Sequence, residues 1–174
     1  MLFFLATVAA IAMMVRIGIH GSPLKTAGTP LGIINLEIPL DSSKAKGIVD
    51  KWQVTAYTNN TNLAQHAINN TFLDFALIAA YSFFFVIGML LFRKGGFGLA
   101  SKLALMFGWW CLLPGALDVV ENFYLIQWLQ GNIYAWQAPF VSVLAITKFA
   151  LAIVLLVMNL FGLVQLVKEA LNKK

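Results

Sequence analysis

The chain has 174 residues, of which 60% are hydrophobic and 11% are charged. Soluble domains carry about 25% charged residues, so this composition excludes an ordinary soluble domain and indicates a membrane protein. The net charge is +5, without a long basic run interleaved with aromatic residues, so we expect no nucleic-acid partner. The length favours one compact domain over residues 1–174.

The first apolar run covers residues 2–19 and is short for a membrane span. Such a run also occurs in secretory signal peptides, which begin with positively charged residues. No positive residue precedes Leu2, so we expect an uncleaved first span.

Residues 20–71 form an expected outer segment that is ordered rather than a plain linker. Between Pro30 and Pro39, apolar residues alternate along the chain, which favours an extended, ordered loop packed on the bundle. Asp41 is a suitable helix N-cap, and the apolar residues after it recur at helical spacing, which predicts a short amphipathic helix. We expect Glu37 and Trp52 to be contact residues of this segment.

Three further apolar runs follow, at residues 72–92, 103–128 and 139–167. A helix needs about 20 mostly apolar residues to cross the hydrocarbon layer. The last two runs reach this length only if Asp118, Glu121 and Lys148 lie inside the membrane. The predicted fold is therefore all-α, an integral membrane bundle of four transmembrane helices with an ordered extracytoplasmic segment between helices 1 and 2. Pro114 is expected to bend the third helix.

Lysine and arginine residues predict the orientation of these helices. The link between the second and third runs carries only basic charges, and so does most of the tail. The positive-inside rule places both in the cytoplasm, and therefore both termini as well. The lysines of the outer segment argue against this orientation, but long loops count less in the rule. The basic residues of the link and tail are Arg93, Lys94, Lys102, Lys168, Lys173 and Lys174.

Charged residues inside the four runs fall at a common depth. At about 1.5 Å per helical residue, they lie roughly 22 to 30 Å from the cytoplasmic end of each run. The hydrocarbon layer is ~30 Å thick, so all of them lie in its outer part. Charges at membrane depth normally face the interior of a bundle and have partners. Together with two polar neighbours at helical spacing, the candidate intramembrane polar cluster comprises Arg16, Asp74, Tyr81, Asp118, Glu121, Asn122 and Lys148.

Several interpretations of this cluster stay open. Its three acids and two bases leave one negative charge without a partner if all are ionised. The simplest interpretation is a set of structural ion pairs that hold the helices in register. A metal site built from His66, Asp74 and Glu121 is conceivable, but the spacing matches no known ligand motif. No motif in the sequence requires a cofactor, and no catalytic residue is identified.

Three functions are compatible with these features. The leading hypothesis is a non-catalytic subunit or interaction protein of a larger membrane assembly, with the bilayer and other membrane protein chains as partners. The alternative is a small proton- or ion-linked carrier, in which Asp118 and Glu121 titrate and Lys148 is the counter-charge. A further alternative is an intramembrane enzyme that acts on lipid headgroups at the outer leaflet, with Asp74 or Glu121 as general base.

The order of these features resembles that of a loose group of small bacterial four-span membrane proteins. The resemblance covers most of the chain, and its sharpest element is the D-x-x-E-N pattern. It implies a bacterial inner-membrane protein with both termini inside, and it implies no substrate. The residues that carry it are Gly32-Ile33-Ile34-Asn35-Leu36-Glu37, Trp52, Asp74 with Tyr81, Asp118-Val119-Val120-Glu121-Asn122 and Lys148.

Overall fold

The structure is a computed structural model that describes residues 1–58, 60–95, 102 and 108–172. Helices make up most of it. The elements, in chain order, are α1 (Leu2–His20), η1 (Ser22–Leu24), α2 (Ile34–Glu37), α3 (Ser42–Val54), β1 (Ala56–Thr58), β2 (Thr61–Asn62), α4 (Leu63–Gly95), η2 (Trp110–Leu112), α6 (Leu113–Leu129) and α7 (Gln137–Asn172).

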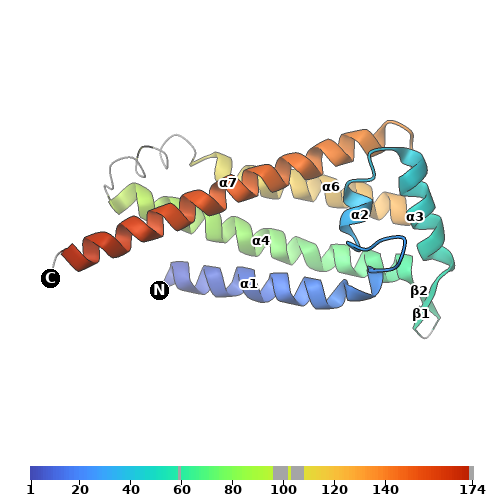
Figure 1. The fold of residues 1–174 in the computed structure, drawn as a ribbon, viewed down its shortest axis with the longest axis horizontal. Coiled ribbons are helices and arrows are strands. Elements are labelled where there is room, and N and C mark those ends of the chain that lie inside the picture. Colours follow the sequence, from blue (N-terminus) through green and yellow to red (C-terminus); the bar gives the residue numbers. More distant parts are fainter. Residues whose placement is uncertain (59, 96–101, 103–107, 173–174) are drawn as a thin grey trace.

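The four longer helices α1, α4, α6 and α7 run lengthwise beside one another, and α3 lies across one end of them (Figure 1). Helix α4 packs against α1, α6 and α7 and is therefore the central helix. Residues 21–62, which we call the cap, gather at the end where α3 lies, and both chain termini lie at the opposite end (Figure 1). The cap contacts α4, α6 and α7 directly.

Within the described residues, three helices are long and apolar enough to cross a membrane. They cover Leu2–His20, Leu63–Leu91 and Gln137–Val164, which confirms helices at the first, second and fourth predicted runs. Helix α4 begins well before the predicted run. Asn62 provides its N-terminal cap, because its side chain accepts a hydrogen bond from the backbone N–H of Gln65 at 2.8 Å.

The third predicted run differs from the structure in two ways. Helix α6 has 17 residues and begins at Leu113, and residues 103–107 of the run lie outside the described part of the chain. Pro114 was expected to bend a continuous helix, and in the structure it lies in the first turn of α6, directly after η2. The missing N–H of proline costs no helical hydrogen bond at that position.

Only some of the basic residues predicted to face the cytoplasm lie within the described part of the chain. Lys102 and Lys168 are exposed. The side chains of Arg93 and Lys94, and the whole of Lys173 and Lys174, lie outside the description.

The predicted amphipathic helix of the outer segment is confirmed as α3. The Asp41 side chain accepts a hydrogen bond from the backbone N–H of Lys44 at 2.8 Å, which is the predicted N-cap. The buried residues of α3 are Ala45, Val49 and Trp52, as the helical spacing predicted.

Two local features of the cap were not predicted. The stretch expected to be extended contains α2, because Gly32 turns the chain at φ +66 and Asn35 Oδ1 then accepts the backbone N–H of Leu31 at 2.8 Å. Strands β1 and β2 form a small antiparallel hairpin. Asn60 in its turn has φ +70, a conformation that asparagine tolerates better than most residues.

The larger apolar core lies where the cap meets the helix ends. Trp52 of α3 and Trp128 of α6 are 1% and 0% exposed, and α2, α4 and α7 add further buried side chains. Burying large aromatic side chains is a main source of stability. The cap is therefore a packed part of the fold, and it fixes the loop elements that approach the charged residues.

Candidate functional site

Lys148 of α7 lies at the centre of the candidate site and is 5% exposed. Its Nζ atom donates to Asp118 Oδ1 at 2.6 Å and to Glu121 Oε1 at 3.0 Å. A third carboxyl oxygen, Glu37 Oε2, lies 3.4 Å from the same nitrogen. Lys148 Nζ therefore donates hydrogen bonds to two carboxyl groups and forms an ion pair with the third, whose Oε2 atom accepts no hydrogen bond from a described residue. We call Glu37, Asp74, Asp118, Glu121 and Lys148 the charge cluster.

Asp118 has partners for both of its carboxyl oxygens. Oδ1 accepts from Lys148, and Oδ2 accepts from the Tyr81 hydroxyl at 2.8 Å. Tyr81 is on α4, so Asp118 joins three helices through two charge-assisted hydrogen bonds. Each oxygen of the Asp118 carboxyl group is therefore met by one donor.

Asp74 lies at the edge of the cluster and is half-buried. Its Oδ2 atom accepts a hydrogen bond from Asn122 Nδ2 at 2.8 Å. Asp74 is on α4 and Asn122 is on α6, so this bond is a second polar link between the two helices. Six predicted site residues therefore come together in the structure, namely Asp74, Tyr81, Asp118, Glu121, Asn122 and Lys148.

Arg16 does not belong to the cluster, which corrects its predicted position. It is exposed on α1 and makes no ion pair or side-chain hydrogen bond with the residues the structure describes. The depth of Arg16 along its helix was compatible with the cluster, but its side chain is on a different face. Helix α1 packs against α4 through small residues such as Ala6 and Ala10, which are buried.

Glu37 was expected to be a contact residue of the outer segment, and the structure places it in the charge cluster instead. Helix α2 brings it to Lys148, and it is 8% exposed. Burial raises the pKa of the Glu37 carboxyl, and the nearby ammonium of Lys148 only partly offsets this effect. Trp52, the other expected contact residue, is buried in the core between the cap and the helices.

The charge cluster contains more acid than base. Four carboxyl groups face one ammonium group, so full ionisation would leave three negative charges uncompensated in a buried site. Two buried carboxyl oxygens, Glu37 Oε2 and Glu121 Oε2, accept no hydrogen bond from any described residue. Unpartnered buried charge is costly, so bound protons are the simplest way to neutralise these groups.

Two histidines form a separate polar group where α1 ends and α4 begins. The rings of His20 and His66 stack with centroids 4.4 Å apart, and Tyr57 packs on His66 at 4.2 Å. His66 Nε2 donates to the carbonyl oxygen of His20 at 2.7 Å, and His20 Nδ1 lies 3.0 Å from Asn70 Oδ1. The conceivable metal site needs His66 beside Asp74 and Glu121, and His66 instead contacts His20 and Tyr57.

In the described part of the chain, no group of three or more His, Cys, Asp or Glu residues is arranged to hold a metal ion.

No protein-family model matches this chain, and neither the curated proteins nor the solved structures provide a match. The geometry of the site therefore carries the functional argument by itself.

Proposed function

We propose that the chain is a four-span protein of the bacterial inner membrane that acts as a non-catalytic subunit or interaction protein of a larger membrane assembly. In this proposal α1, α4, α6 and α7 cross the membrane, both termini are cytoplasmic, and the cap lies outside. Helix α6 has 17 residues and is about 26 Å long, and η2 lies directly before it.

The observation that carries the proposal is the tie between the cap and the helices. Glu37 reaches Lys148 of α7, and the backbone N–H of Leu40 donates to Ser142 Oγ of α7 at 3.1 Å. Three carboxyl groups of the charge cluster contact Lys148 Nζ. These contacts favour a structural role, in which the cluster holds the cap on the helices. They do not favour a role in converting or transporting a substrate.

The cap also presents apolar side chains that the fold leaves uncovered. Leu31, Leu40 and Val54 are 58%, 59% and 84% exposed. Outside the membrane such residues are covered neither by lipid tails nor by the core, and groups of them often mark contacts with another protein. A rigid cap with exposed apolar residues supports an interaction protein.

The test is purification of the tagged full-length chain from its native membrane in mild detergent, followed by mass analysis of the intact particle. We expect a partner chain in stoichiometric amount. Val54→Glu should release this partner, because it places a charge on the most exposed apolar residue of the cap. Gln65→Glu adds the same charge to an exposed position of α4 and should leave the complex intact. A wild-type particle with the mass of this chain alone would refute the proposal.

A proton-linked carrier is the second candidate, because three carboxyl groups share one lysine and two of their buried oxygens lack hydrogen-bond partners among the described residues. Against it, the described core on the terminal side of the cluster is mostly apolar, with Phe85, Met89 and Leu155 buried there. The test is proton uptake by liposomes containing the purified chain. The carrier hypothesis predicts uptake that Glu121→Gln abolishes, and uptake that is absent or unchanged in the variant would eliminate it.

A further inference from the structure

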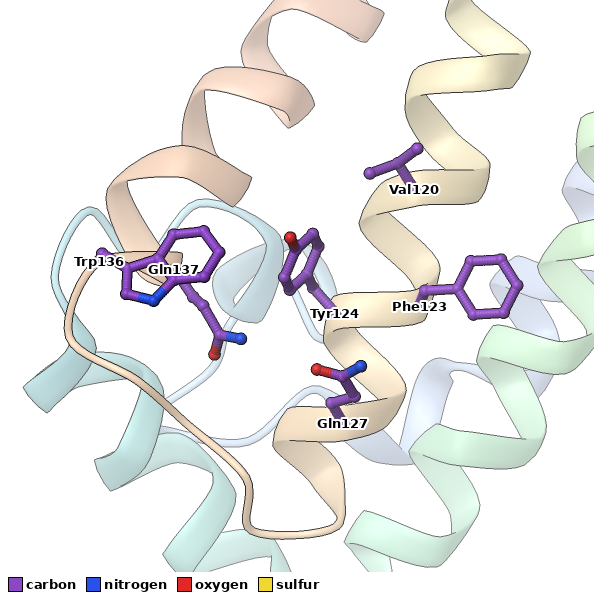
Figure 2. A pocket seen from close by; sticks show the side chains of 6 residues that line it. All are labelled: Val120, Phe123, Tyr124, Gln127, Trp136 and Gln137. Atoms are coloured by element: carbon purple, nitrogen blue, oxygen red, sulfur yellow. The ribbon is translucent and has the colours of Figure 1, made fainter.

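A pocket of about 420 Å³ opens on the side of the molecule between α6 and the start of α7. Figure 2 shows Tyr124 and Gln127 of α6 facing Trp136 and Gln137 across it. Val120 and Phe123 complete the lining. The lining contains no charged residue, so the pocket is separate in chemistry from the charge cluster.

Two glutamine side chains give this pocket amide N–H donors, and hydrogen bonds within the fold hold one of them, Gln137, in place. Gln137 is 3% exposed, and its Oε1 accepts from Trp128 Nε1 at 2.8 Å and from the Tyr134 backbone N–H at 3.0 Å. The amide Nε2 of Gln137 donates to no residue that the structure describes and lines the pocket. The Gln127 side chain is exposed and makes no hydrogen bond with a described residue. The two amides suit an acceptor such as an ester or phosphate oxygen.

The aromatic groups of the pocket provide a surface for a cation. The rings of Tyr124 and Trp136 lie nearly perpendicular, with centroids 6.0 Å apart, and Trp136 is 60% exposed. An alkylammonium group is attracted to the face of such a ring. Tryptophan and tyrosine also prefer the level of the lipid headgroups.

Next to the pocket, an exposed apolar stripe begins at Trp136, just before α7, and continues along that helix. Trp136, Phe140 and Val143 follow one another at helical spacing and are 60%, 40% and 62% exposed. Phe123 on α6 is also exposed, at 59%, but it points away from Trp136 in Figure 2 and contacts Phe75 of α4. A ligand with a polar head in the pocket would therefore find a surface for hydrocarbon chains along the same helix.

We propose that this pocket binds one zwitterionic phospholipid of the outer leaflet, with its phosphate or ester oxygens on the amides of Gln127 and Gln137 and its ammonium group on Trp136. A zwitterion fits because the pocket offers amide donors and aromatic faces but no lysine or arginine for an anionic headgroup. The inference uses the orientation given in the proposed function, but it requires no partner protein.

The test is native mass spectrometry of the full-length chain released from nanodiscs that contain equal amounts of phosphatidylethanolamine and phosphatidylglycerol. We expect one retained phosphatidylethanolamine. Trp136→Ala and Gln127→Ala should each weaken its binding about tenfold, the effect of losing one cation–π contact or hydrogen bond. Trp136→Phe should recover part of the binding, because it keeps an aromatic face.

Two matched variants serve as controls. Trp109→Ala removes a tryptophan that is 88% exposed and lies before α6, and Gln65→Ala removes an exposed glutamine of α4. Both should retain the lipid as the wild type does. Equal retention of the two lipids, retention unchanged in Trp136→Ala and Gln127→Ala, or preference for phosphatidylglycerol would overturn the proposal. Thermal unfolding of each variant shows whether it is folded. A folded variant that loses its partner protein but keeps the lipid would show that lipid binding does not depend on the proposed function.

Discussion

Glu37 in the cap and Lys148 in the middle of α7 lie with Oε2 and Nζ 3.4 Å apart, although they are distant in the sequence. The same ammonium group binds Asp118 and Glu121 of α6. One buried lysine thus links the cap to the helices beneath it. This relationship makes the stability of the cap dependent on groups that lie in the predicted membrane layer.

The pH dependence of this link can be measured through Glu37. Because burial raises its pKa above the ordinary value of 4.5, the folded state holds the proton more tightly than the unfolded state. The contribution of Glu37 to the free energy of unfolding is therefore most favourable below about pH 4.5. It declines as the pH rises toward the raised pKa. Glu37→Gln cannot ionise, so its stability relative to wild type should increase over this range. The measurement is thermal unfolding of both proteins from pH 4 to pH 8 in the same detergent, and parallel curves would contradict the prediction.

Trp52 is expected to be the main apolar anchor of the cap. It is 1% exposed against the ends of the helices, so Trp52→Ala should lower the free energy of unfolding by about 3–5 kcal/mol. Val54→Ala, in the same helix but 84% exposed, is the matched control and should change it by less than about 0.5 kcal/mol. Equal effects of the two substitutions on unfolding would show that the cap is not packed as described.

The close approach of α4 and α7 depends on Gly88. A Cβ atom added there would collide with Asn159 Oδ1, so Gly88→Ala should destabilise the fold by about 1–3 kcal/mol. Gly18→Ala in α1 is the control, because a Cβ there has no neighbour within 4 Å, and alanine favours the helix by up to about 1 kcal/mol. Unfolding in detergent should show opposite signs for the two variants. Adding Asn159→Ala should restore much of the stability lost in Gly88→Ala, and no recovery would contradict this contact.

The proposed orientation is testable with single cysteines. The buried Cys111 is first replaced by serine. Cysteine at the exposed positions 44 and 168 should then behave differently toward a membrane-impermeant maleimide applied to intact cells. We expect labelling of Lys44→Cys from outside and labelling of Lys168→Cys only after the membrane is permeabilised. The reverse pattern would mean that the cap is cytoplasmic and the tail is outside. Labelling of both cysteines from outside would place both positions outside, which contradicts the odd number of spans proposed between them.

Much of the helical architecture follows from local sequence. Apolar length predicts α1, α4 and α7, and the Asp41 cap with apolar spacing predicts α3. Helix phase and depth also bring Asp118, Glu121 and Lys148 together, because these residues lie on long, regular elements. Their positions can be calculated from the rise and twist of a helix.

The remaining features depend on long-range packing. Arg16 has a suitable depth but not a suitable face, since the packing of α1 on α4 determines which side turns inward. Glu37 reaches the cluster only because the cap folds back over α6 and α7, which helix periodicity does not encode. The one signal in the sequence for the burial of Glu37 was that it is an acid between apolar neighbours. One of these neighbours, Leu36, is fully buried in the structure. The pocket beside Trp136 likewise depends on the angle at which α7 leaves the α6–α7 loop.

The most direct test of the charge cluster is a double-mutant cycle between Asp118 and Lys148. Asp118→Asn, Lys148→Met and the double variant are compared by the free energy of unfolding in lipid bicelles. The account predicts a coupling energy of at least about 1 kcal/mol, because each single substitution removes the 2.6 Å bond between Lys148 Nζ and Asp118 Oδ1 and leaves a buried charge with one partner fewer. A parallel cycle between Arg16→Gln and Asp118→Asn should be additive within about 0.5 kcal/mol. Additivity between Asp118 and Lys148 would contradict the central claim that their ion pair holds the interior of the bundle together.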